Sequence, residues 1–442
     1  MKNSILFIQI ILFLLTAERS ESQSIFTVKD YAHYNYSIQQ KDQEEKGIKN
    51  NLNDYGINLT VNFKNDFLEN VSGGIKTGPG YIGLFKPDLS LDFSKMFHWD
   101  GAGMLISAIG NTGDYFNNKV GTEQGIDNIE AYNTWKIYEL WIEQKLFNEN
   151  LSLKFGLYDL NSEFDVRLSS LVFLNPSQAI GPEYSLTGKN GPSIFPATSV
   201  AFRIKYISSS MPCELSSKIT GNDFHYFLQA AVLDGVPGDP DNPVGIQIIF
   251  NKNDGLLLAA ETGIIKNEKD FGNGYEKYSL GGWYYSSGFK EFLNTNISGN
   301  PVYQKGNYGI YFSAEKFLFS EAKNPGEGLA GFLSIGMSNK NINRVDSYFG
   351  AGINYTGLVP GRDKDQFGIA LALAHNSSKY IIQMQSENID ISSYESIIEM
   401  TYLLKLSDWL KLQPDIQYVI NPVYSLNNAY SFVSGIRIEL IL

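Results

Sequence analysis

The chain is short of charge, of cysteine and of basic clusters. Only 19% of its 442 residues are charged, and 47 Asp and Glu against 35 Lys and Arg give a formal net charge of -12. A nucleic-acid-binding protein needs a clustered basic face, and the sequence offers none. Cys213 is the single cysteine, so it cannot form an internal disulfide, and we expect its thiol to be inert. The composition therefore excludes nucleic acid as a partner.

Motifs for metal, cofactor or nucleophilic chemistry are also lacking. The four histidines, His33, His98, His225 and His375, are scattered along the chain without the close spacing of zinc ligands. No phosphate loop, complete dinucleotide fingerprint or nucleophile elbow is present. We therefore expect no metal, no cofactor and no enzymatic activity.

Long hydrophobic runs are absent except at the N-terminus. Lys2 is followed by an apolar run from Ile5 to Leu15, and the small residues Ser20 and Ser22 come next. This run is too short to span a bilayer, and its flanks are those of a secretory signal peptide over residues 1–22. A buried helix is the alternative. A cleaved signal peptide predicts export to the periplasm or beyond.

Because no later segment approaches eighteen continuous apolar residues, any membrane span must be built from strands. The sequence is rich in Gly, Tyr and Phe, with 41, 27 and 28 residues. Apolar residues recur with a period of two in about sixteen segments, most of them near the length of a tilted transmembrane strand. These segments are residues 55–63, 84–93, 104–109, 137–147, 150–159, 199–207, 224–232, 256–264, 278–284, 308–314, 329–337, 349–355, 367–373, 398–406, 409–420 and 436–442.

The two faces of these segments differ in a way that favours a membrane barrel. In residues 137–147 one face carries Tyr138, Leu140, Ile142 and Leu146, and the other carries Glu139, Trp141, Glu143 and Lys145. Aromatic residues such as Tyr206, Trp409 and Tyr418 lie near segment ends, as in the aromatic girdles of barrels with lipid outside and water inside. A soluble antiparallel sheet also alternates. We predict an all-β fold, a transmembrane antiparallel β-barrel of about sixteen strands in the bacterial outer membrane.

Residues 23–53 are polar and charged and have no period of two. We interpret them as a periplasmic N-terminal extension. The barrel itself is predicted over residues 54–442.

The longest interruption after a well-formed strand runs from Asp159 to Pro196. It contains too many Phe, Leu and Ile residues for a solvated tail, so it must fold against another part of the protein. In a barrel the available place is the lumen. There the segment would act as a constriction loop and place Asp159, Asn161, Glu163, Asp165 and Arg167 in the path of a solute.

Several runs of this sequence resemble a known family. They are GLYDLNSEFD at 156–165, GPEYS at 181–185, GKNGPSIFPATS at 188–199 and WLKLQPDIQYVINP at 409–422. Because of these runs, the chain from about residue 54 to residue 442 resembles the carbohydrate-selective porins of bacterial outer membranes, the OprB-type family. The resemblance implies a monomeric sixteen-stranded barrel whose inward loops form a constriction that favours sugars.

A channel selective for mono- or oligosaccharides needs hydrogen-bond donors, acceptors and aromatic surfaces that bind sugars weakly enough to release them. We expect donors at Arg167, Arg203 and Lys205, acceptors at Asp159, Glu163, Asp165, Glu139, Glu143 and Asp415, and rings at Trp141 and Tyr158. For each charged residue, the alternative is a side chain that is solvated or paired in a wide lumen. Lipid of the outer membrane would surround the barrel.

Other functions remain open on the sequence alone. A general diffusion porin would have the same strands without a preference for sugars. A soluble exported carbohydrate-binding β protein would partition into the aqueous phase without detergent. An outer-membrane barrel enzyme such as a lipase would need a Ser, a His and a carboxylate together near the rim.

Overall fold

A computed structural model of the chain describes residues 52–208, 224–245, 248–251, 253–267, 271–272, 274–295, 300–321, 326–424 and 429–442. The predicted signal peptide, the predicted extension up to residue 51, and Cys213 lie outside the described residues. The first strand begins at Ile57.

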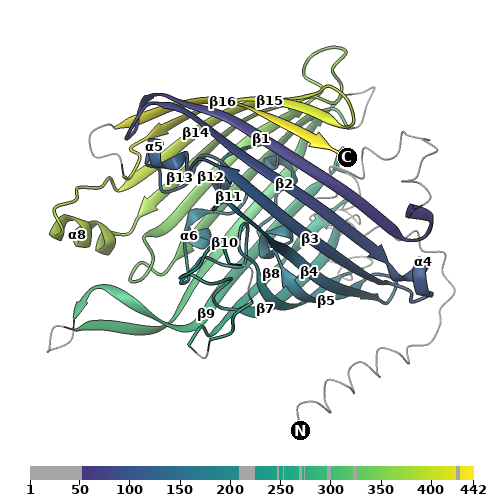
Figure 1. Cartoon of the computed structure of the whole chain (residues 1–442), viewed down its shortest axis with the longest axis horizontal. Coiled ribbons are helices and arrows are strands. Elements are labelled where there is room, and N and C mark those ends of the chain that lie inside the picture. Colours follow the sequence, from purple (N-terminus) through teal and green to yellow (C-terminus); the bar gives the residue numbers. More distant parts are fainter. Residues whose placement is uncertain are drawn as a thin grey trace, which may run out of the picture.

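Across the described residues, sixteen antiparallel strands form a closed barrel in which each strand pairs with the next and β16 pairs with β1 (Figure 1). This closure leaves no unpaired edge strand. The predicted fold class is confirmed. The strands are β1 Ile57–Gly73, β2 Gly78–Asp92, β3 Ala102–Gly113, β4 Thr134–Leu146, β5 Leu151–Tyr158, β6 Ser199–Ile207, β7 Phe224–Asp234, β8 Leu256–Lys266, β9 Glu276–Thr295, β10 Pro301–Ser320, β11 Gly328–Ser338, β12 Val345–Thr356, β13 Gln366–Asn376, β14 Tyr394–Lys405, β15 Leu410–Ile420 and β16 Tyr430–Ile441.

Helices are short and lie in the connections between strands. They are α4 Phe93–Phe97, α5 Asn117–Val120, η2 Leu160–Ser162, η3 Leu168–Ser170, η4 Pro176–Gln178, α6 Pro182–Ser185 and α8 Ser378–Ser386. No helix among the described residues has the length and apolar character needed to cross a membrane.

The strands bury one face toward the interior of the barrel and expose the other. In β15, Lys411, Gln413, Asp415 and Gln417 are buried, whereas Tyr418 on the other face is exposed. Successive side chains of a strand point to opposite faces, so the polar residues of β15 face inward together with the buried Val419, and its other apolar residues face outward. The predicted alternation of a polar interior and an apolar exterior is confirmed for this strand.

A β-bulge in β4 corrects one predicted orientation. Ser107 pairs with Glu139 and Ala108 pairs with Ile137, so Tyr138 is an extra residue without an opposite partner. Its side chain is buried, and its hydroxyl donates to the Asp159 carboxylate at 2.5 Å. The prediction that Tyr138 shares the outward face of Leu140 was wrong, because the bulge turns its ring into the barrel.

The strands β9 and β10 are longer than predicted, with 20 residues each. Figure 1 shows their hairpin extending beyond the neighbouring strands. The ring of Phe292 in this hairpin lies 5.4 Å from the ring of Tyr380 in α8, and its N–H donates to the Asn341 carbonyl at 2.9 Å. These contacts join β9 to α8 and to the segment around Asn341.

Two of the long connections at the end of the barrel opposite to the start of β1 matter for the interior. Loop 114–133 joins β3 to β4, and loop 159–198 joins β5 to β6. In outer-membrane barrels the long loops lie on the extracellular side and the short turns on the periplasmic side. Both loops therefore originate at the extracellular end.

Candidate solute path

Loop 159–198 crosses the interior of the barrel. Its backbone carbonyls accept hydrogen bonds from buried side chains of strands far apart around the wall. These are Gln229 of β7 to Glu163 at 2.9 Å, Lys277 of β9 to Val166 at 2.9 Å, Tyr348 of β12 to Ser177 at 2.7 Å, and Gln413 of β15 to Val172 at 2.5 Å. All four donors lie on the inward face, so the loop lies inside the barrel.

Short capped turns give this loop its local shape. The Asp159 carboxylate caps η2 by accepting from the Asn161 N–H at 2.9 Å. The Asn175 side chain caps η4 by accepting from the Ser177 N–H at 3.0 Å, and Pro176 occupies the first turn. Asp and Asn are favoured at N-caps, and Pro is favoured in the first turn, as after Asn175, so these turns are encoded in the sequence.

The loop is joined to β4–β6 by a buried charge network. Arg203 of β6 contacts the Glu163 carboxylate at 2.6 Å and the Glu143 carboxylate at 2.7 Å. Lys154 lies 3.1 Å from Glu163, and the Tyr158 hydroxyl donates to Glu163 at 2.8 Å. Burial alone would raise the pKa of the Glu163 carboxyl, but Arg203 and Lys154 outweigh it and hold that pKa well below its usual range.

The two predicted aromatic residues lie within this network. The ring of Trp141 carries the Lys154 ammonium 3.9 Å from its centroid, and its indole N–H donates to the Glu139 carboxylate at 3.1 Å. Trp141 and Tyr158 are only 2% and 1% exposed. A cation over an aromatic face is attracted by the ring, so in this conformation the Trp141 face is occupied by Lys154.

Asp165 and Arg167 form a second buried pair, which faces β8 to β11. Arg167 lies 2.5 Å from the Asp165 carboxylate and donates to the carbonyls of Gln178 and Ala179 at 3.1 and 2.9 Å. Burial raises the pKa of Asp165 to about 6, although Arg167 opposes the shift. Each partner therefore depends on the other for compensation of its charge.

The remaining predicted site residues are less enclosed or lie elsewhere. Asp159, Asn161 and Lys205 are partly exposed, and Lys205 lines a small hollow together with Gln229. Asp415 lies on the wall formed by β15, where it accepts from the Gln417 side chain at 3.0 Å. The structure thus brings together Trp141, Glu143, Tyr158, Glu163 and Arg203, and it keeps Asp415 apart from them.

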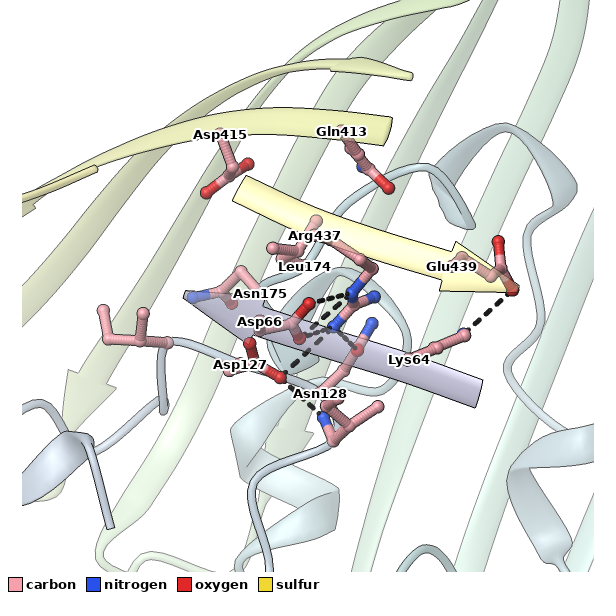
Figure 2. A network of polar contacts seen from close by, with 12 residues as sticks. Lys64, Asp66, Asp127, Asn128, Leu174, Asn175, Gln413, Asp415, Arg437 and Glu439 are labelled. Atoms are coloured by element: carbon pink, nitrogen blue, oxygen red, sulfur yellow. Dashed lines mark hydrogen bonds and ion pairs between the residues drawn. The ribbon is translucent and has the colours of Figure 1, made fainter. Parts of the chain in front are cut away.

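Loop 114–133 also lies inside the barrel, and the sequence interpretation missed it. Figure 2 shows Arg437 of β16 between Asp66 of β1 and residues Asp127 and Asn128 of this loop. The Arg437 guanidinium contacts Asp66 at 2.6 Å, Asp127 at 3.2 Å and the Asn128 side-chain oxygen at 2.9 Å. The loop is therefore fixed to the strand pair that closes the barrel.

The two loops also contact each other. The Asn128 backbone N–H donates to the Leu174 carbonyl at 2.8 Å, and the Asn175 side chain donates to the Gly125 carbonyl at 2.9 Å. The segment between β3 and β4 has no period of two, and that break in the strand pattern is the signal that could have identified this second loop.

The carboxyl of Glu183 in α6 is fully buried, and its Oε2 atom has no hydrogen-bond partner. Burial raises the pKa of Glu183 to about 8, the Asp165 carboxylate adds to the shift, and Arg167 opposes it. The folded loop therefore favours the protonated acid.

This shift predicts a loop that loosens as the pH rises. Because the folded pKa of Glu183 lies above its ordinary value of 4.5, ionisation of Glu183 lowers the stability of the folded loop. This loss of stability is absent below about pH 4.5, grows as the pH rises, and reaches its full size above about pH 8. Between pH 6.5 and 8 the local stability of α6 should fall by about 2 kcal/mol, since Asp165 titrates mostly below this range. Hydrogen exchange of the α6 amides measures the change.

Glu183→Gln should remove most of this pH dependence. The exposed Glu387, which directly follows α8, provides the control, and Glu387→Gln should keep the wild-type slope. An unchanged slope in Glu183→Gln would contradict the assignment.

Comparison with known proteins agrees with this geometry. The model of the family described as "Carbohydrate-selective porin, OprB family" matches residues 76–440. The chain is 24% identical to "Porin B" of Pseudomonas aeruginosa over 439 residues, which covers 89% of each chain. It superposes on the high-pH structure of Pseudomonas putida OprB with a TM-score of 0.76 at 20% identity, covering 90% of this chain and 96% of that one.

The low-pH structure of the same Pseudomonas putida protein gives a TM-score of 0.54 at 17% identity, covering 91% of this chain and 98% of that one. At these identities the structures support the fold, and the family match extends over most of the barrel. The chain belongs to the OprB family of carbohydrate-selective porins.

Proposed function

We propose that loops 114–133 and 159–198 together form the constriction that gives this channel its preference for sugars. Membership of the family makes the protein a passive, carbohydrate-selective channel of the outer membrane and not an enzyme. The observation that carries the proposal is that loop 159–198 bonds to inward side chains of strands from β7 to β15. A chain segment fixed across the lumen must narrow the path that remains.

Within the predicted site residues we assign two roles. The partly exposed Asp159, Asn161 and Lys205 contact the hydroxyl groups of the passing sugar. The buried groups hold the loop and set the electric field in the gap; they are Glu139, Glu143, Trp141, Tyr158, Glu163, Asp165, Arg167, Arg203 and Asp415. Fixed charges of both signs favour polar neutral solutes over apolar ones.

We further propose that the mature protein consists of the extension over residues 23–53 and the barrel over residues 54–442, after removal of a signal peptide over residues 1–22. The barrel would act as a monomer surrounded by outer-membrane lipid. Exposed outward side chains such as Phe155, Phe202 and Leu228 support contact with lipid. Mass spectrometry of the purified protein would identify the mature N-terminus, which we expect near Gln23.

Swelling of liposomes that contain the purified protein tests the proposed constriction. Glucose and disaccharides should enter faster than amino acids of matched size. Lys205→Ala should reduce this preference by about 3- to 10-fold, because it removes one hydrogen bond to the solute. Asp159→Ala should reduce it by at least as much, because it also removes the cap of η2 and the bond from Tyr138. Glu163→Ala, Asp165→Ala and Arg167→Ala should reduce it further by releasing the loop.

Lys316→Ala is the matched control, because this lysine is exposed on the strand face opposite to the buried Glu315. It should leave the preference unchanged. Entry rates set by solute size alone, in the wild type and in all variants, would mean a general diffusion pore and would refute the proposal.

A further inference from the structure

Both inward loops rest on glutamates of the barrel wall through their backbone amides. Four inward-facing glutamates, here called the wall glutamates, accept these bonds. They are Glu261 of β8, Glu315 of β10, and Glu395 and Glu399 of β14. All four are at most 2% exposed. Glu395 and Glu399 are four residues apart in β14 and therefore share its inward face.

Three wall glutamates hold loop 159–198 at successive points. Glu261 accepts from the Asp165 N–H at 2.8 Å, and Glu315 accepts from the Ser169 N–H at 3.0 Å and the Ser169 hydroxyl at 2.9 Å. Glu399 accepts with one oxygen from the Leu174 N–H at 2.5 Å and with the other from the Asn175 N–H at 3.2 Å. The contacts follow the loop along the wall from β8 to β14.

The fourth wall glutamate holds loop 114–133. One oxygen of Glu395 accepts from the Glu123 and Gln124 N–H groups at 3.1 and 3.0 Å and from the Thr122 hydroxyl. The other oxygen accepts from the Glu123 N–H and from the Val423 N–H, both at 2.9 Å. A cluster of backbone N–H groups in a turn is a favourable site for an anion, and here the anion is a side chain of the wall.

We propose that the wall glutamates are positioning residues that fix the two loops in the geometry of the open channel. The bonds from the loops are donated by backbone N–H groups and by Ser or Thr hydroxyls. A carboxylate presents two acceptor oxygens to such donors, whereas a glutamine presents one oxygen and one NH₂ group that repels them. A charge-assisted hydrogen bond is also stronger than a neutral one. Substitution of Glu by Gln therefore detaches part of a loop without changing its own side chains.

This inference rests on the proposed function only in its effect on transport, so the experiment measures loop attachment and transport separately. Hydrogen exchange is followed in detergent for the amides of residues 123–124, 169 and 174–175. In Glu399→Gln, exchange at 174–175 should rise about 10-fold or more while 123–124 stays protected. Glu395→Gln should give the reciprocal result. Glu315→Ala should act at residue 169; alanine is used there because both Ser169 bonds share one oxygen of Glu315, which a glutamine could retain.

Glu276 of β9 supplies the control, because it pairs with the exposed Lys316 at 2.7 Å and its partner lies on the outward face. Glu276→Gln should leave exchange at all three positions unchanged. Heat-modifiable electrophoretic mobility selects the folded fraction of each variant, and if one variant does not fold, either of the other two provides the same test at its own amide.

The outcomes separate the two proposals. Local loss of protection together with a lower ratio of sugar to amino-acid entry supports both. Local loss of protection with an unchanged ratio confirms that the glutamates position the loops and refutes the loops as the selectivity element. Unchanged protection at the contacted amides overturns the positioning role, whatever the transport result.

Discussion

Replacing Arg203 by Met is expected to lower the free energy of unfolding by about 3–5 kcal/mol, because it breaks a buried ion-pair network. The guanidinium contacts both Glu163 and Glu143. Without it, Glu163 keeps its ion pair with Lys154, and Glu143 loses its ion pair with Arg203. The midpoint of unfolding in urea, followed by the shift in electrophoretic mobility between folded and unfolded barrels, measures the loss.

Lys316→Met provides the control. Lys316 pairs with Glu276 at 2.7 Å, and its side chain is 46% exposed. An exposed pair of this kind contributes about 0–1 kcal/mol. Arg203→Met should also loosen the start of loop 159–198 and reduce the preference for sugars, since Glu163 is one of the attachment points of the loop. Equal effects of the two substitutions on unfolding would contradict the buried network.

The strands could be predicted from the sequence because a barrel in lipid imposes one simple rule on them. Apolar residues must face lipid and polar residues the lumen, so the period of two extends across the membrane. Outside the membrane this rule ends, which is why β9 and β10 were predicted too short. Their hairpin is held by Phe292 against Tyr380, a contact between distant segments that no local pattern encodes.

Tyr138 shows a second limit of periodicity. A single bulge opposite Ser107 and Ala108 reverses the face of this residue without changing the composition of β4. Because the hydroxyl of Tyr138 then bonds to Asp159, the bulge also attaches the start of loop 159–198 to the wall. A side chain predicted to face lipid is therefore part of the candidate site.

The charged residues of the site could be found from sequence, but their burial could not. Glu163, Asp165 and Arg167 stand out because they follow a strand directly, and all three lie in the loop that crosses the lumen. Whether such a residue contacts solvent or a partner depends on the register of strands such as β6, which brings Arg203 beside Lys154. The position of loop 114–133 could not be predicted for a related reason. Much of its attachment uses backbone N–H groups, which do not depend on the side chain and so leave no pattern in the sequence.

Replacing Arg437 by Met is the second substitution with a large expected effect. Arg437 carries the compensating charge for Asp66 on β1 and for Asp127 on loop 114–133 (Figure 2). Burial raises the pKa of Asp127 well above its ordinary value, Asp66 adds to the shift, and Arg437 opposes it. Without the arginine, Asp127 would take up a proton and lose its attraction to β16. We expect a loss of about 3–5 kcal/mol in unfolding free energy.

The effect of Arg437→Met should be greatest in loop 114–133, since the strand hydrogen bonds between β1 and β16 remain. Single-channel recordings should therefore show more frequent brief closures as this loop moves in the lumen. Lys316→Met is again the control, because Lys316 is 46% exposed and pairs with Glu276 at 2.7 Å; it should cost about 0–1 kcal/mol. If Arg437→Met shows neither additional closures nor a change in the unfolding midpoint, the loop is held without this arginine. The backbone hydrogen bonds to Glu395 would then account for the attachment.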